Sequence, residues 1–221
     1  MGQRFIISGT GPRAGRTTVG CAVAFAFKVR GFRVGVMKPV ATGCVERDGM
    51  PAADDGAALI AAASSDLPVD LVSPYRYRSP MPPVEAARAD DAAAPDFETI
   101  DRALRQIDER SDVVIVEDAH GLAAKLDTAK DFADLALAHG LEMILVIAQR
   151  PGYFEATHEA VEFARMRGVT VRGAILNALD RDASASIAND AAALEQAAGI
   201  RMLGTVRFKE PLSLSIVEQL L

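Results

Sequence analysis

The sequence predicts an α/β protein with a doubly wound, mainly parallel sheet and helices on both faces. Two observations carry this prediction. Short, almost continuous apolar runs recur along the chain, and stretches with helical periodicity separate them. Apolar runs that do not alternate with polar residues suit strands covered on both faces, and strand–helix alternation is typical of parallel sheets.

Strands are expected where Phe, Ile, Val, Leu and Met dominate a run, because most of these side chains fit a buried, pleated surface. These runs are residues 5–7, 34–37, 113–116, 143–147, 171–176 and 203–206. The segments between them have helical periodicity, and their bounds are set by capping and turn residues. Helices are therefore predicted at 15–30, 54–64, 97–109, 128–139, 155–167 and 184–198.

Residues 67–95 interrupt the alternation. Six prolines fall in this segment, and proline at that density opposes regular helix. We therefore expect an excursion between the second and third main strands, lying beside a site. Its Ala- and Asp-rich part, residues 86–94, is expected to form a mobile, solvated turn.

The composition of the chain limits the classes of function that it can have. The chain has 221 residues, half of them hydrophobic, which predicts a single domain over residues 1–221. Its net charge is −6 and its cations are scattered, so no nucleic-acid partner is expected. No apolar run approaches the roughly 20 residues of a membrane span, so no membrane partner is expected. Two cysteines, and no signal-peptide pattern before the first strand, favour the cytoplasm.

A glycine-rich turn joins the first strand to the first helix, with the sequence SGTGPRAGRTT at residues 8–18. Backbone N–H groups in such a turn converge on a polyphosphate, and the helix N-terminus adds partial positive charge. The Thr17 hydroxyl is placed to bind Mg²⁺, and Arg16 stands where a P-loop normally carries Lys. A P-loop NTPase type of sheet is therefore expected; the alternative is a glycine turn that binds nothing. Its predicted nucleotide contacts are Gly11, Pro12, Arg13, Ala14, Gly15, Arg16, Thr17 and Thr18.

The second strand runs into Lys38-Pro39-Val40-Ala41-Thr42-Gly43. Together with the loop, this tract resembles the dethiobiotin synthetase family, which has a Gly-Thr-Gly-Thr-Asp-Val-Gly-Lys-Thr-like loop and then Lys-Pro-Val-(Ala or Gln)-(Ser or Thr)-Gly. The resemblance covers nearly the whole chain. Further matches are Asp54-Asp55, Pro74-Tyr75-Arg76-Tyr77, Val114-Ile115-Val116-Glu117, Asp131-Phe132-Ala133-Asp134-Leu135-Ala136 and Gly173-Ala174-Ile175-Leu176-Asn177.

The resemblance implies an ATP- and Mg²⁺-dependent ligase of biotin biosynthesis. Such an enzyme closes a ureido ring from CO₂ and the vicinal diamine 7,8-diaminononanoate, through a carbamate and its mixed phosphoric anhydride. The barrier is chiefly one of charge and positioning. The motif match implies a role for each of these residues. Thr17, Asp55 and Glu117 would bind Mg²⁺, and Lys38 and Thr42 would bind the substrate and take part in catalysis. Arg16 would contact the phosphates as a third catalytic residue, and Asn177 would bind the adenine.

Several of these assignments have plainer alternatives. Lys38 could be a surface lysine at a strand end, as most lysines are. Asp55 could cap the helix that follows it. Asn177 could be a turn residue. Glu117 stands at the carboxyl end of a strand, where open α/β sheets bind ligands, which favours function there.

The chain departs from the family pattern at the site. Arg16 replaces Lys, and Pro12-Arg13 replaces a hydroxyl and usually a carboxylate. Glu117-Asp118-Ala119-His120-Gly121 replaces Glu-Gly-Ala-Gly-Gly, so Asp118 and His120 add bulk where glycine would let the backbone approach a substrate. Since His120, His139 and His158 share no ligand spacing, surface or packing roles are predicted for them.

The family also implies a homodimer, in which the segment after Gly152 helps to hold the substrate carboxylate across the interface. Glu155 places an anion there, which puts the usual diamino acid in doubt. The expected dimer surface is an apolar stripe that could instead pack on the protein's own sheet. Its residues are Ala156, Ala160, Phe163 and Ala164.

Two other functions stay open. The first is a nucleotide-binding regulatory P-loop protein without ligase activity, which Arg16 and the crowded 117–121 turn favour. The second is a related ligase with a different amine substrate. The retained Lys38-Pro39-Val40 tract favours an enzyme.

Overall fold

The computed structural model describes residues 2–47 and 49–221. Its centre is a six-stranded sheet in the order β10-β9-β8-β1-β7-β2, with every neighbouring pair parallel. The α/β class and the parallel sheet are confirmed, and each strand predicted from an apolar run lies within an observed strand. The strands are β1 (Gln3–Gly9), β2 (Val34–Met37), β7 (Val113–Glu117), β8 (Glu142–Gln149), β9 (Val171–Ala178) and β10 (Met202–Val206).

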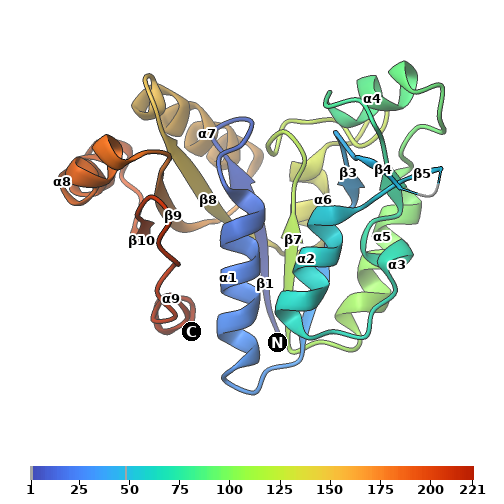
Figure 1. Cartoon of the computed structure of the whole chain (residues 1–221), viewed down its shortest axis with the longest axis horizontal. Helices are drawn as coiled ribbons and strands as arrows, with labels where there is room; N and C mark the ends of the chain where they lie inside the picture. Colours follow the sequence, from blue (N-terminus) through green and yellow to red (C-terminus); the bar gives the residue numbers. More distant parts are fainter. Residues whose placement is uncertain (1, 48) are drawn as a thin grey trace.

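Helices cover both faces of this sheet. In Figure 1, α1 lies in front of β1 and α2 in front of β7. The connections through α6, α7 and α8 run across the sheet in the opposite direction, and right-handed crossovers place them on the other face. The main helices are α1 (Arg16–Lys28), α2 (Asp54–Ala63), α5 (Phe97–Asp108), α6 (Phe132–His139), α7 (Tyr153–Arg167) and α8 (Arg181–Ala198), with a short α9 (Ile216–Leu220) near the end.

The core lies between the sheet and these helices. All five residues of β7 are buried, as are seven of the eight in β8, which explains why their sequences do not alternate. Phe5 of β1 stacks on Phe27 of α1 with ring centroids 5.9 Å apart. This contact packs the last turn of α1 against β1.

The proline-rich segment is more regular than predicted. It contains two short helices, and the expectation that proline prevents helix here is wrong because Pro83 occupies the first turn of one of them, where its missing N–H is not needed. The expected solvated turn at 86–94 is wrong at its start, because Ala86 and Ala87 are buried. The elements are α3 (Val69–Val72), β6 (Tyr75–Arg76) and α4 (Pro83–Ala89).

This excursion holds the tract that follows β2. After Met37 the chain leaves the central sheet, and β3 (Val40–Ala41) pairs in parallel with β6. A short antiparallel pair follows, β4 (Glu46–Arg47) with β5 (Met50–Pro51). Lys38 and Thr42 are thereby fixed at the carboxyl edge of the sheet, as expected of an excursion beside a site.

No helix among the described residues has both the length and the apolar character needed to cross a bilayer.

Candidate functional site

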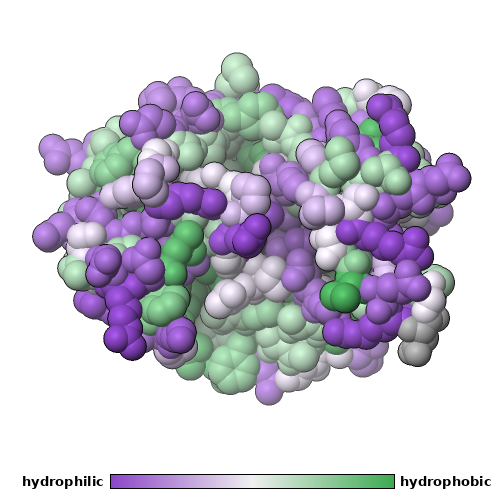
Figure 2. All heavy atoms as spheres, turned by 45° about the horizontal axis from the view of Figure 1, so that its top comes forward, coloured by the Kyte–Doolittle hydropathy of each residue, from purple (hydrophilic) through white to green (hydrophobic). Residues whose placement is uncertain are grey.

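A cavity of about 620 Å³ opens at the carboxyl ends of β1, β2 and β7. Figure 2 shows this face, with a hydrophilic hollow near its centre. Most of the predicted site residues meet here, together with Pro80, which was not predicted, and His120, which was predicted only to add bulk at the site. The lining consists of Pro12, Arg13, Ala14, Gly15, Arg16, Thr17, Thr18, Lys38, Thr42, Asp55, Pro80, Glu117 and His120.

The glycine-rich loop leads from β1 into the N-terminus of α1. Gly15 caps the helix with φ 95°, and a Cβ there would lie 2.3 Å from Nδ2 of Asn177. Asn177, at the end of β9, donates from Nδ2 to the carbonyl of Ala14 at 2.8 Å. Gly15 is therefore required both for the backbone angle and for the close approach of Asn177. Asn177 holds the loop, and its contact with adenine stays a prediction.

Lys38 lies at the centre of the site. Its side chain is 5% exposed, so the surface-lysine alternative is wrong. Its Nζ lies 2.5 Å from Oε1 of Glu117 and 3.3 Å from Oδ2 of Asp55. The Thr17 hydroxyl donates to the same Glu117 oxygen at 2.8 Å. The structure thus joins Lys38 to all three predicted Mg²⁺ ligands.

These oxygens suit Mg²⁺. Glu117 Oε2 is buried and has no hydrogen-bond partner among residues 2–47 and 49–221. The site offers two carboxylates, Asp55 and Glu117, and the hydroxyl of Thr17. No three His, Cys, Asp or Glu side chains gather in the described part of the chain in a way that could hold a metal ion. Mg²⁺ takes hard oxygen ligands, commonly one or two carboxylates completed by water and substrate phosphate. Thr17, Asp55 and Glu117 therefore fit a Mg²⁺ ion that arrives with a nucleotide.

Asp55 does not cap α2. The N-cap is Ala53, and no side chain caps this helix, so the capping alternative is wrong. The neighbouring Asp54 forms an ion pair with Arg47, its Oδ1 2.6 Å from Nη1. These contacts leave the carboxylate of Asp55 to Lys38.

Arg16 and Asp118, two of the departures from the family pattern, contact each other. Arg16 Nε lies 3.6 Å from Oδ1 of Asp118, and its Nη1 donates to the Gly11 carbonyl at 3.4 Å. Asp118 is fully buried; burial raises the pKa of its carboxyl, and the charge of Arg16 opposes that rise. The guanidinium at the P-loop cation position is thus held by a neighbouring anion.

His120 is part of the site. Its Nε2 lies 3.2 Å from Oγ1 of Thr42, and its backbone has φ 68°, a left-handed conformation that is uncommon for histidine. Burial, followed by the charge of Arg16, lowers the pKa of the imidazole, which favours its neutral form at pH 7. His120 thus packs against Thr42 and also lines the cavity, and a part for it in the reaction stays a proposal. Its position just after β7, beside Glu117, was the signal in the sequence.

The other two histidines agree with the prediction. His139 Nε2 lies 2.8 Å from Oδ1 of Asp101, a contact between α6 and α5. His158 is exposed on α7.

The predicted residues of α7 lie outside the cavity. Gly152 is the exposed N-cap of the helix, and Glu155 lies in a groove between α7 and α8. Gly11 borders a second cavity of about 380 Å³, between the glycine-rich loop and α7. Within one protomer, Glu155 therefore does not meet Lys38.

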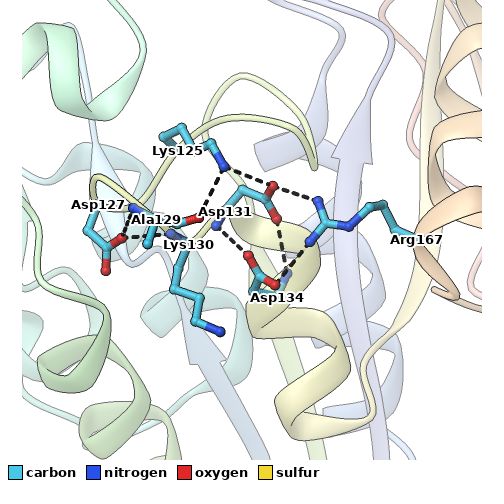
Figure 3. Close-up of polar contacts among 7 residues, drawn as sticks. All are labelled: Lys125, Asp127, Ala129, Lys130, Asp131, Asp134 and Arg167. Carbon is cyan, nitrogen blue, oxygen red and sulfur yellow. Dashed lines mark hydrogen bonds and ion pairs between the residues drawn. The ribbon is translucent and has the colours of Figure 1, made fainter.

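A cluster of charges anchors the segment after β7 (Figure 3). Asp131 and Asp134 form a capping box that starts α6 at residue 132 rather than at the predicted 128. Arg167 of α7 bridges both, with Nη1 2.6 Å from Asp131 and Nη2 3.0 Å from Asp134, and Lys125 lies 3.5 Å from Asp131. Burial opposes ionisation of Asp131, but the bonds from Arg167 and Asp134 outweigh it and lower the pKa of this carboxyl.

We expect Arg167→Ala to lower the free energy of unfolding by about 2 kcal/mol at pH 7, because a buried carboxylate loses its main partner. The lowered pKa of Asp131 stabilises the fold above the unfolded pKa, so this difference should shrink as the pH falls below about 4. Urea unfolding measures both. Arg78→Ala, which removes the exposed pair with Glu46, is the control and should cost less than about 1 kcal/mol. Equal losses for the two variants at pH 7 would contradict the role of Arg167.

Three solved structures share this fold. The cell division ATPase MinD of Pyrococcus furiosus aligns with a TM-score of 0.57 at 19% identity, over 99% of this chain and 87% of that chain. The MinD cell division protein of Aquifex aeolicus gives 0.54 at 11%, over 99% and 86%. A ParA family ATPase from Chlorobium tepidum TLS gives 0.53 at 14%, over 99% and 89%. These likenesses establish the P-loop NTPase type of fold predicted from the sequence.

The model of the AAA_26 family, described as an AAA domain, matches residues 3–214. That range contains the glycine-rich loop, the Lys38 tract and Glu117. This family includes dethiobiotin synthetase-like P-loop proteins. The chain therefore belongs to the AAA_26 family of P-loop, ATP-binding proteins.

Proposed function

We propose that this protein is an ATP- and Mg²⁺-dependent ligase that closes a ureido ring from CO₂ and a vicinal diamine, as in dethiobiotin synthesis. The observation that carries the proposal is the buried Lys38, paired with Glu117 and Asp55 beside a phosphate-binding loop. A regulatory nucleotide site needs no second cation next to the phosphates. A ligase does, because the carbamate and the phosphate that activates it are both anions.

Each side chain has a role in this reaction. Thr17, Asp55 and Glu117 would hold Mg²⁺. The positive charge of this ion would offset the negative charge of the nucleotide phosphates. Lys38 is placed to bind a carbamate oxygen. Thr42 and His120, linked at 3.2 Å, form the opposite wall, where they can hydrogen-bond to an amine. The backbone of residues 11–18 supplies N–H donors for the phosphates.

A nucleotide-binding regulatory protein is the second candidate. The observation that favours it is the Arg16–Asp118 pair, because a cation held by a buried carboxylate is less free to follow a phosphoryl group. Fold neighbours named as cell division ATPases and as a ParA family ATPase are compatible with this candidate. An amine that stimulates ADP release supports the ligase. Nucleotide binding with no response to any vicinal diamine supports the regulatory protein.

A homodimer is part of the proposal. In this protomer Ala164 is buried in the protein's own core, whereas Ala156, Ala160 and Phe163 are only partly buried and line the second cavity. The stripe thus packs on its own sheet in part, and the rest of it borders that cavity, so the surface that a second copy would cover stays a prediction. Sedimentation at micromolar concentration measures the mass, and a 23.4 kDa species alone would reject the dimer.

Arg16→Lys should raise kcat about tenfold while changing nucleotide affinity by less than about threefold. A planar guanidinium holds ground-state phosphates, but it is poorly shaped to follow a migrating phosphoryl group, so the gain belongs to the transition state. Steady-state kinetics with saturating amine separates the two parameters. A change confined to KM for ATP would contradict this reasoning.

A further inference from the structure

The second cavity lies between the loop Ser8–Gly11, the turn 120–123 and one face of α7. Its volume of about 380 Å³ falls within the range of small-molecule sites. The roles proposed above leave most of its lining unused. In Figure 2, hydrophobic surface lies above the central hollow, on the side where Figure 1 places α7.

We propose that this cavity binds the aliphatic tail of the amine substrate, and that Glu159 selects a tail whose far end is cationic or uncharged over one that ends in a carboxylate. The inference rests on the proposed ligase function and names its substrate class.

The two cavities are neighbours and share a lining residue. His120 borders both, and Gly11 of the tail cavity is followed directly by Pro12 of the Lys38 cavity. A substrate whose amines lie beside Lys38 and Thr42 would therefore have to extend past His120 to place its tail in the second cavity. The imidazole is well placed to contact the carbon next to the reacting amines.

The lining suits a hydrocarbon chain. Leu122 and Ala123 form one wall, and Ala160 and Phe163 form the opposite wall on α7. Burying an aliphatic chain against such groups favours binding by roughly 0.8 kcal/mol for each CH₂ group. Phe163 is held from behind by Arg167, whose guanidinium carbon lies 5.6 Å from the ring centroid.

Charge sets the preference at the far end. Within the described residues, the lining contains no Lys or Arg, and Glu159 is its one carboxylate. Two arginines reach the loop end of the cavity, where Arg16 donates to the Gly11 carbonyl at 3.4 Å and Arg150 donates to the Pro12 carbonyl at 2.7 Å. On the α7 side, Arg167 bridges Asp131 and Asp134. A substrate carboxylate that lies beside Glu159, on the α7 side of the cavity, would thus meet an anion. An ammonium group would meet an opposite charge.

Glu155 provides a matched comparison. It lies one helical turn before Glu159 and carries the same group, but it borders only the groove with Leu194 and Ala198. Glu159 borders that groove and the tail cavity. Both glutamates are exposed enough to be replaced without loss of packing. Each replacement by Gln removes one negative charge. Only the replacement at Glu159 removes a charge that borders the tail cavity.

The test is calorimetry with three ligands of equal chain length: 7,8-diaminononanoate, its terminal amide, and 1,7,8-triaminononane. Wild type should bind the triamine about tenfold more tightly than the amide, and the amide about tenfold more tightly than the carboxylate. In Glu159→Gln the three affinities should agree within about threefold. Glu155→Gln should keep the wild-type order.

Four results would overturn the proposal. Wild type could bind the three ligands equally or bind none of them, Glu159→Gln could keep the wild-type order of affinities, or Glu155→Gln could lose that order. Binding is measured without turnover, so the two proposals fail separately. If the predicted order holds but no amine yields a ring product, the ligase function fails and the site stands as an amine site. If 7,8-diaminononanoate is both the tightest ligand and a good substrate, the ligase function stands and the role of Glu159 fails.

Discussion

Lys38→Met should lower kcat for ring closure by about 10²- to 10³-fold, the loss found when a fixed group that stabilises transition-state charge is removed. Lys38 is 5% exposed and contacts both Glu117 and Asp55, so no other cation can take its place without rearrangement. The same change leaves Glu117 buried beside Thr17 without a cation. We expect it to cost about 3 kcal/mol of unfolding free energy as well.

Kinetics and urea unfolding together separate these two effects for Lys38. Addition of Mg²⁺ and nucleotide should recover part of the stability, since the ion can take the place of the lost charge beside Glu117. Lys28→Met, at an exposed position in the last turn of α1, is the control and should change neither quantity appreciably. A kcat within about threefold of wild type for Lys38→Met would remove Lys38 from the reaction.

Thr17→Ala should weaken ATP binding in the presence of Mg²⁺ by about 10²-fold and leave the weak binding in EDTA nearly unchanged. Its hydroxyl donates to Glu117 at 2.8 Å, at the N-terminus of α1, where a P-loop hydroxyl binds the ion. The carboxylates of Asp55 and Glu117 line the same cavity and offer a divalent ion hard oxygen ligands beside this hydroxyl.

Calorimetry with and without Mg²⁺ measures this difference. Thr17→Ser keeps a hydroxyl at the same position and should bind within about fivefold of wild type. No heat for wild type up to millimolar nucleotide, or an identical trace for Thr17→Ala, would show that the loop is not a Mg²⁺–nucleotide site.

The parts of the fold that were predicted correctly have local causes. The apolar runs in β7 and β8 are buried on both faces, and burial of that kind leaves a direct pattern in the sequence. The order of loop, Lys38 tract and Glu117 at strand ends likewise follows from parallel topology, because carboxyl ends share one edge of the sheet. The resemblance assigned Lys38 and Glu117, 79 residues apart, to one site, and the position of Glu117 at a strand end agreed with that assignment.

The predictions of secondary structure were wrong where an element depends on contacts with residues far away in the sequence. The α6 start depends on the Asp131–Asp134 capping box and on Arg167, which lies on another helix. Helix in the proline-rich segment depends on Pro83 falling in a first turn and on burial of Ala86. Such placements have no signature in the spacing of residues along the chain.

The site contains two further contacts that a sequence cannot show. The departures Arg16 and Asp118 were each visible, but their pairing depends on how the loop after β1 meets the turn after β7. Asn177 reaches Ala14 across 163 residues. The sequence analysis predicted neither contact, because both depend on how separate loops and strands pack together.

The most direct measurement is carbon-13 NMR of a reaction containing ATP, Mg²⁺, ¹³C-bicarbonate and a vicinal diamine, with 1,7,8-triaminononane and 7,8-diaminononanoate compared side by side. The ligase account predicts a labelled ureido carbonyl, formed with one ADP for each ring, present in wild type and lost in Lys38→Met. ATP binding with no labelled ring from either diamine, at protein concentrations comparable to those of the substrates, would contradict it.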